Sequence, residues 1–165
     1  MANTGNAGID AATLQAAMAQ FQDLLAQNEQ LLNDLNVYPV PDSDTGSNTL
    51  HTLKAGIANA SGHVADVGEY ATALATGAAK SALGNSGVIL AQYLQGLAQG
   101  LSQIETTDQC SPSEWQQSLE QAAVVARESV LTPAEGTMLT IADAAANVAA
   151  QSLSLIHISE PTRPY

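Results

Sequence analysis

Apolar residues recur every three or four positions along nearly the whole chain, which places them on one face of an α-helix. After Asp10, a residue suited to begin a helix, the first apolar series comprises Leu14, Met18, Phe21, Leu25, Leu31, Leu32 and Leu35. Alanine is abundant throughout, and it has the highest helix propensity of all residues. No segment alternates apolar and polar residues with a period of two. The sequence therefore predicts an all-α domain with essentially no sheet.

Six helices are expected along the chain. The first runs from Asp10 to a loop at Asn36, and the others span about 47–60, 67–82, 86–102, 113–130 and 136–152. At 165 residues the chain has room for one domain with a substantial core. Three of the helix starts carry unusual polar motifs. In an antiparallel bundle these three starts would gather at one end.

Charge and composition restrict the partners of this chain. Sixteen acidic residues oppose four Lys and Arg, for a net charge of -12, which disfavours nucleic acid and anionic membrane surfaces as partners. Because cations are so few, backbone amides and a divalent metal would suit a phosphate ligand better than a lysine clamp would. Neither a Walker A sequence nor a Rossmann glycine fingerprint occurs. The single cysteine, Cys110, has no CxxC partner, and the N-terminus lacks the pattern of a secretory signal. We therefore expect a cytoplasmic protein without membrane insertion.

The segment from Asn36 to Asn48, NVYPVPDSDTGSN, predicts an ordered acidic loop between the first two helices. Pro39 and Pro41 fix φ and bias the residues before them toward extended conformations, which ends the first helix. Asp42 and Asp44 are separated by one residue, so in an extended segment both carboxylates point the same way. The two carboxylates can therefore converge on one hard cation.

Small residues follow the two carboxylates, namely Thr45, Gly46, Ser47 and Asn48. Their small side chains and exposed amides suit an anion-binding nest or a helix N-terminus that holds phosphate. An acidic pair beside an anion site implies a metal between them. A helix-capping turn also explains Asp-Ser-Asp-Thr-Gly from local preferences alone. An EF-hand does not, because Leu53 stands at the twelfth position, where a bidentate Glu is needed.

Two later segments, GNSGVILAQ at 84–92 and EGTMLT at 135–140, also lie at expected helix starts. The first of them opens with Gly84, Asn85, Ser86 and Gly87. Glycines permit close backbone approach and the serine offers a hydroxyl to phosphate, although an ordinary Asn or Ser cap explains the same residues. The second contains Gly136, Thr137 and Met138. From the residues alone, that segment is interpreted as core.

The three segments together resemble the nucleotide-binding DhaL domain of the dihydroxyacetone kinase family, and more closely its fatty acid kinase branch. The matching stretches are VYPVPD, DTG with a small residue and Asn, GNSGVILAQ and EGTMLT, in the family's order. Two positions depart from the family pattern. Ser43 stands where the family usually has Gly for a tight backbone conformation. Leu83 stands where an Arg is common, and Lys80 is the nearby cation that could partly replace it.

The resemblance implies an antiparallel barrel of eight helices, about six of them present here, with ATP and magnesium at one rim. It implies that Asp42 and Asp44 hold Mg²⁺ and act in catalysis, with Asn36 as a further metal ligand. The residues implied to contact ATP are Thr45, Gly46, Ser47, Asn48, Gly84, Asn85, Ser86, Gly87, Gly136, Thr137 and Met138. Among them, Met138 would pack on the base and Thr137 would reach a phosphate or ribose oxygen.

The activity implied by the resemblance is ATP- and Mg-dependent phosphoryl transfer to a substrate that a partner presents. In the fatty acid kinase branch, a fatty-acid-binding protein presents an acyl carboxylate. In the other branch, another subunit presents dihydroxyacetone. The sequence VYPVPD at residues 37–42 favours the first branch. Two other hypotheses remain: a non-catalytic nucleotide-binding regulatory module, which Leu83 favours, and a metal-stabilised helical scaffold without nucleotide.

The C-terminal stretch LSLIHISEPTR, residues 153–163, resembles the translated read-through of a transposase sequencing adapter. We therefore interpret residues 1–152 as a DhaL-like ATP-binding domain that is incomplete at its C-terminus, and residues 153–165 as an artefactual tail. In an incomplete barrel the first and sixth helices lack two neighbours. We expect both helices to expose apolar faces.

Overall fold

The computed structural model describes residues 8–37, 40–63, 65–104 and 109–158, without the side chains of 153–158. Its helices are α1 (Ala11–Asp34), α2 (Thr45–Ala60), α3 (Val67–Lys80), α4 (Gly84–Leu101), α5 (Pro112–Glu128) and α6 (Met138–Ile158). Within these described ranges no strand occurs, and sheet-like pairing is limited to one antiparallel bridge between Ile9 and Cys110. The all-α prediction is confirmed.

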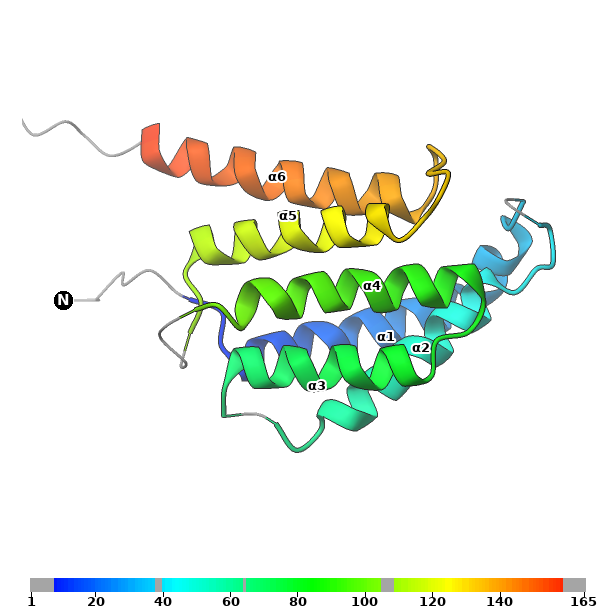
Figure 1. Cartoon of the computed structure of the whole chain (residues 1–165), viewed down its shortest axis with the longest axis horizontal. Coiled ribbons are helices and arrows are strands. Elements are labelled where there is room, and N and C mark those ends of the chain that lie inside the picture. The colour runs from blue at the N-terminus through cyan, green and yellow to red at the C-terminus, as the bar shows by residue number, and fades with distance from the viewer. Residues whose placement is uncertain (1–7, 38–39, 64, 105–108, 159–165) are drawn as a thin grey trace, which may run out of the picture.

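The helices lie side by side with their axes roughly parallel to the long axis of the molecule, and successive helices run in opposite directions (Figure 1). α4 is central: it packs against α2, α3 and α5, while α6 packs mainly on α5. α1 packs against α2 and α3. In the described part of the chain α1 and α6 do not contact each other, so they form the two edges of the array.

Small residues allow the helices to approach closely. Gly96 of α4 faces α5, and a Cβ built on it would lie 2.7 Å from the Cα of Ala122. The core between the helices consists largely of alanine and leucine, with Tyr70, Leu14, Leu53, Leu74 and Leu101 among its largest fully buried side chains. This close packing determines how near the helix starts come to one another.

The expected helix boundaries agree with the structure to within two residues, except at the end of α6. Asp10 caps α1 as predicted, since its Oδ1 accepts a hydrogen bond from the amide of Thr13 at 2.7 Å. α6 continues to Ile158, past the junction expected after residue 152. Residues 159–165 lie outside the described ranges, and the interpretation of 153–165 as an artefactual tail stays a prediction.

Both edge helices expose apolar side chains, as expected. On α1 and at its end these are Leu24, Leu31 and Leu35, and on α6 they are Ile141 and Val148. None of the described helices combines the length and apolar character needed to cross a bilayer.

Candidate functional site

The three motif-bearing helix starts, those of α2, α4 and α6, lie at the same end of the molecule's long axis, on the right in Figure 1. This placement follows from the alternating direction of the helices, because every second helix begins at that end. The arrangement agrees with the one expected from the sequence. Distances within it decide which motifs form a common site.

The starts of α2 and α4 are in direct contact. The hydroxyl of Ser86 donates a hydrogen bond to the backbone oxygen of Thr45 at 3.4 Å. Gly84 has a φ of +60°, and a Cβ built on it would lie only 2.4 Å from Nδ2 of Asn48. A larger residue at this position would therefore meet both backbone strain and a clash. The glycine allows the first two motifs to meet.

The acidic loop turns through Ser43, which has a φ of +56°. This left-handed conformation is uncommon for a residue with a Cβ, whereas glycine adopts it without steric cost. Ser43 thus adopts the backbone conformation for which the family pattern favours Gly. Pro39 lies outside the described ranges, so the restriction of the loop backbone that we expect from it stays a prediction.

Asp42 is exposed and Asp44 is half-buried at the position that precedes α2. Asp44 makes no capping hydrogen bond with its side chain. Among the described residues, no hydrogen-bond or ion-pair partner is found for the side chain of Asp42 or Asp44. The interpretation of this segment as a simple capping turn does not hold for Asp44, since its carboxylate does not cap the helix.

The cap of α2 comes from α1. Oδ1 of the buried Asn33 accepts hydrogen bonds from the amides of Gly46 at 2.8 Å and Ser47 at 3.2 Å. Nδ2 of Asn33 donates to Oγ of Ser47 at 3.1 Å, and that hydroxyl donates to Glu29 at 2.7 Å. The sequence predicted exposed amides here, but those of Gly46 and Ser47 are occupied. Sequence reasoning missed Asn33; a polar residue on the buried face near a helix end was the available signal.

Asn36 braces the acidic loop from within. Its Nδ2 donates to the backbone oxygen of Val40 at 2.6 Å, and its Oδ1 accepts a hydrogen bond from the hydroxyl of Thr45. An amide oxygen carries two lone pairs, so one remains beside the bond to Thr45. The role of Asn36 as a metal ligand stays a prediction.

The start of α4 is uncapped. Leu83 occupies the capping position, and in the described structure no side chain caps the helix. The first-turn amides, those of Gly84, Asn85 and Ser86, are therefore left to solvent or a ligand at the positive end of the helix dipole. The alternative interpretation, that an Asn or Ser side chain of this motif caps α4, is therefore wrong. Lys80, the cation expected to substitute for an Arg near here, is exposed at the end of α3.

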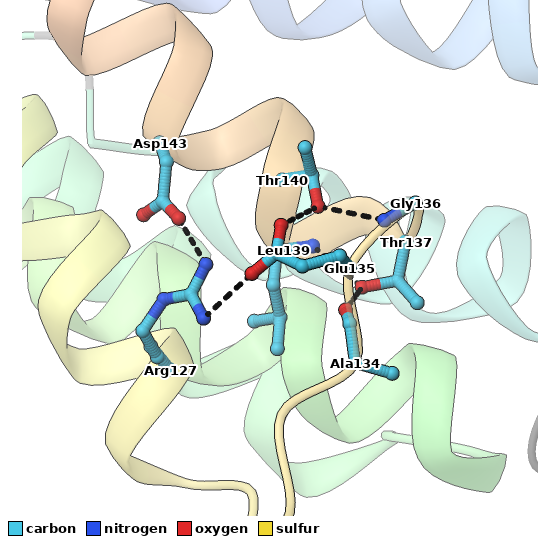
Figure 2. A network of polar contacts seen from close by, with 8 residues as sticks. All are labelled: Arg127, Ala134, Glu135, Gly136, Thr137, Leu139, Thr140 and Asp143. Atoms are coloured by element: carbon cyan, nitrogen blue, oxygen red, sulfur yellow. Dashed lines mark hydrogen bonds and ion pairs between the residues drawn. The ribbon is translucent and has the colours of Figure 1, made fainter.

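The third motif forms a hydrogen-bonded turn against Arg127 at the end of α5 (Figure 2). Gly136 has a φ of +76°, and its amide donates to Oγ1 of Thr140 at 3.0 Å. Thr140 in turn donates to Glu135 at 2.9 Å. Arg127 pairs with Glu135 at 3.5 Å and with Asp143. The hydrogen bond to Asp143 raises the pKa of the Arg127 guanidinium. Sequence reasoning did not identify this network.

Thr137 and Met138 serve the start of α6 in this structure. The Thr137 hydroxyl donates to the backbone oxygen of Ala134 at 2.8 Å and accepts from the amide of Leu139 at 3.3 Å. Met138 is half-buried against the hydrophobic core, as the residues alone suggested. In the described residues no hydrogen bond or ion pair joins this motif to the other two. Its contact with a nucleotide stays a prediction.

The donor set fits a metal bound together with phosphate. Across the described ranges no three His, Cys, Asp or Glu side chains gather into a metal cage of their own. Mg²⁺ is usually held by one or two carboxylates and completes its coordination with water and phosphate oxygens. Asp44, which directly precedes Thr45, and the uncapped start of α4, which bonds to Thr45 through Ser86, match that pattern. A metal-stabilised scaffold without nucleotide fits the residues less well.

A separate hollow of about 600 Å³ lies at the other end of the molecule, between the first half of α3 and the ends of α2 and α4. His63, Asp66 and Thr76 are among the residues that line it. None of the motif residues borders this hollow. Its position therefore adds nothing to the site at the motif end.

Comparison with known proteins shows which family this chain resembles over most of its length. The profile of the DAK2 domain matches residues 39–160. Protein YloV of Bacillus subtilis is 37% identical over 126 residues, which is 76% of this chain and 22% of that protein. An uncharacterized protein of Staphylococcus epidermidis is 36% identical over 126 residues, with the same two shares. Uncharacterized protein SSP1546 of Staphylococcus saprophyticus is 33% identical over 144 residues, or 87% of this chain and 26% of that protein. The chain spans about a quarter of the length of these curated relatives.

Proposed function

The chain belongs to the DAK2-domain family, as its motifs predicted, and on that premise we propose that it binds ATP with Mg²⁺ and donates the γ-phosphoryl group to an acceptor on a partner protein. DAK2 domains of the DhaL type are nucleotide-binding domains in a kinase-related family. The family also implies, in general, a partner subunit. ATP, magnesium, catalysis and the acceptor are the parts that we add as a proposal.

The observation that carries the proposal is the pair of unpartnered carboxylates beside an uncapped helix start. Asp42 and Asp44 make no bond with any described side chain, and the Ser86–Thr45 hydrogen bond holds the start of α4 against that of α2. Free carboxylates and free amides attract opposite parts of a metal–phosphate ligand. Asp44 directly precedes Thr45, the residue to which Ser86 of α4 bonds, and this adjacency supports a shared site.

Each group then has a definite role. Asp42 and Asp44 would hold the cation, with Asn36 as a third ligand. The amides of Gly84 and Asn85 and the hydroxyl of Ser86 would orient phosphate oxygens. A bound divalent cation supplies positive charge that offsets the negative charge on the leaving phosphates. Positioning and charge stabilisation are the main contributions that such a site makes to phosphoryl transfer.

Further contacts to ATP are proposed from the remaining motif residues. Thr45, Asn48 and Gly87 lie at the junction of α2 and α4, where Asn48 lies against Gly84. Gly46 and Ser47 also belong to the proposed set, although Asn33 of α1 occupies their amides. Gly136, Thr137 and Met138 would approach the base or ribose from the start of α6. The space beside Gly136 is open, since nothing lies within 4 Å of a Cβ built on it. A ligand can therefore approach that turn without displacing a side chain.

The acceptor that we propose is a fatty acid carboxylate presented by a fatty-acid-binding partner protein. Transfer would join the γ-phosphorus to a carboxylate oxygen, break its bond to the β-phosphate oxygen, and yield an acyl phosphate and ADP. The stretch from Val37 to Asp42, VYPVPD, supports this branch over dihydroxyacetone. A regulatory module that binds nucleotide without transfer is the second candidate, and Leu83 in place of an Arg is the observation in its favour.

The test is an ATP titration with and without Mg²⁺, followed by a phosphotransfer assay with an acyl-presenting partner. Magnesium-dependent binding with acyl phosphate formation supports the kinase. Binding without transfer to either an acyl group or dihydroxyacetone supports the regulatory module. Absence of binding in both titrations contradicts the proposed function.

A further inference from the structure

Asp44 stands at the position where two other helices of this protein carry a capping aspartate. At α1, Oδ1 of Asp10 accepts from the amide three residues later, at Thr13, over 2.7 Å. At α3, Oδ1 of Asp66 accepts from the amide of Glu69 over 2.8 Å. The equivalent donor for Asp44 is the amide of Ser47. Asp44 leaves that donor unused.

The donor is unavailable because Asn33 occupies it. Oδ1 of Asn33 accepts from the amides of both Gly46 and Ser47, which are the two amides that an N-cap side chain normally reaches. Asn33 and Asp44 therefore compete for the same donors, and Asn33 holds them. From this we infer that Asn33 is a positioning residue, which caps α2 from α1 so that the Asp44 carboxylate stays available to a divalent cation. The inference rests on the proposed function.

The surroundings of Asn33 hold it firmly in this role. Asn33 is buried, with only 8% of its surface exposed. Its Nδ2 donates a hydrogen bond to the Ser47 hydroxyl, which in turn donates to Glu29. Gly46 permits the approach of α1, because a Cβ there would lie 2.3 Å from the backbone oxygen of Glu29. Breaking the two hydrogen bonds that this amide oxygen accepts would leave buried polar groups without partners, which costs free energy.

Removal of the Asn33 amide group should reverse the competition. The amides of Gly46 and Ser47 would lose their acceptor, and Asp44 is the nearest residue of a type that caps helices well. Its backbone, now at φ -124° and ψ 0°, would move to the extended conformation that Asp10 and Asp66 adopt, and its carboxylate would turn onto the helix start. The cation would then lose a ligand although no metal ligand had been replaced.

The experiment compares magnesium dependence in variants of the full chain. We measure the Mg²⁺ concentration that gives half-maximal ATP binding, together with the melting temperature. Asn33→Ala should raise that concentration by about tenfold or more, the range typical for loss of a residue that orients a metal ligand. Asn33→Asp keeps an acceptor oxygen for both amides and should recover most of the magnesium affinity. If Asn33→Ala does not fold, Asn33→Ser replaces it, with the same expected direction.

Asn59→Ala is the matched control. It removes the same amide group from a residue near the other end of α2, where Nδ2 of Asn59 donates to the backbone oxygen of Ala73 at 2.7 Å. This variant should lower the melting temperature without changing the magnesium requirement. A general loss of stability would affect the Asn33 and Asn59 variants alike, whereas a positioning role affects magnesium only in the former.

A double variant completes the test. Asp44→Asn should weaken magnesium-dependent binding strongly in the wild type and much less in the Asn33→Ala background, where Asp44 is already withdrawn. Full additivity, or an unchanged magnesium requirement in Asn33→Ala, would overturn the inference and leave the proposed function intact. ATP binding by the wild type that is absent or independent of Mg²⁺ would overturn both.

Discussion

The starts of α5 and α2 are both acidic, but they use their carboxylates for different purposes. At α5, Glu114 accepts from the amide of Ser111 at 2.7 Å, and Oγ of Ser111 accepts from the amide of Glu114 at 3.3 Å. This reciprocal capping box commits the carboxylate to its own helix. At α2 the cap comes from Asn33 on another helix, and the carboxylate of Asp44 remains free. A helix capped from outside can offer its own carboxylate to a ligand.

The comparison separates two uses of the same residue type. An acidic residue that caps its helix contributes to stability, and its removal should leave ligand binding unchanged. An acidic residue released from capping contributes little to stability, and its removal should affect binding. The following predictions test this separation at α2, α4, α3 and α5.

The largest expected effect concerns Asp42 and Asp44. Asp42→Asn or Asp44→Asn should weaken ATP binding in the presence of magnesium by about 100-fold, because an amide does not supply the charge of a carboxylate ligand. Helix content measured by circular dichroism should stay nearly unchanged. Glu114→Gln at the start of α5 is the control, and its affinity for ATP should equal that of the wild type. Undiminished binding in both Asp variants would remove the metal assignment.

The second prediction concerns Ser86, which connects the start of α4 to Thr45. If its hydroxyl also donates to a phosphate oxygen, Ser86→Ala should weaken ATP binding by ~1.5 to 3 kcal/mol, the usual contribution of a hydrogen bond to a charged group. Isothermal titration measures this loss. Ser102→Ala removes a hydroxyl at the other end of α4, where Ser102 bonds to Gln99. A fall in melting temperature without a loss of affinity would assign Ser86 to helix packing alone.

The third prediction compares two aspartates at helix starts by their effect on stability. Asp66→Ala should lower the free energy of unfolding by about 1 kcal/mol, since Asp66 caps α3. Asp44→Ala should lower it by much less, because Asn33 keeps the cap of α2. Chemical denaturation without ligand measures both values. Equal losses in the two variants would mean that Asp44 caps α2 in solution, contrary to the comparison.

The smallest effect is the pH dependence of stability. The amide of Ser111 lowers the pKa of Glu114 below its ordinary value of 4.5, and the side chain and amide of Thr13 lower the pKa of Asp10. A carboxyl with a lower pKa in the folded state stabilises the fold above its unfolded pKa, and this contribution is lost as pH falls through the folded pKa. The melting temperature should therefore decrease as the pH is lowered below about 4.5.

Glu114→Gln should make that decrease shallower, because its amide has no proton equilibrium in this range. Glu120→Gln, at an exposed position of the same helix, is the matched control and should leave the profile nearly as in the wild type. A profile that does not change in Glu114→Gln would show that the capping box contributes nothing to the pH dependence. The contrast between α5 and α2 would then rest on the other three predictions.

Much of the fold was predictable because its signals are local. The apolar spacing identified all six helices, and Asp10 marked the start of α1. The acidic loop was located from its prolines and its two carboxylates. The resemblance located two further motifs at helix starts. What the residues did not reveal was whether Asp44 caps α2, since a capping turn and a metal loop have the same composition.

The network around Arg127 was equally hidden in the sequence. Arg127 lies on α5, Glu135 in the turn that follows, and Asp143 on α6, so the three side chains meet only when two helices pack together (Figure 2). A single arginine on a predicted helix gives no sign of such a partner. Its position behind the third motif became evident only from the packing of α6 on α5.

By itself, the sequence determined the helical fold class, the order of the helices and the segments that carry polar chemistry, because periodicity and capping depend on residues three or four positions apart. Tertiary structure decided which polar groups are used and which remain free. Asn33 reaches Gly46 across 13 positions and Ser86 reaches Thr45 across 41, so both bonds depend on how closely the helices pack. The small residues that permit this approach are visible in the sequence. Only the packing shows that Asn33 takes the capping role and leaves Asp44 free.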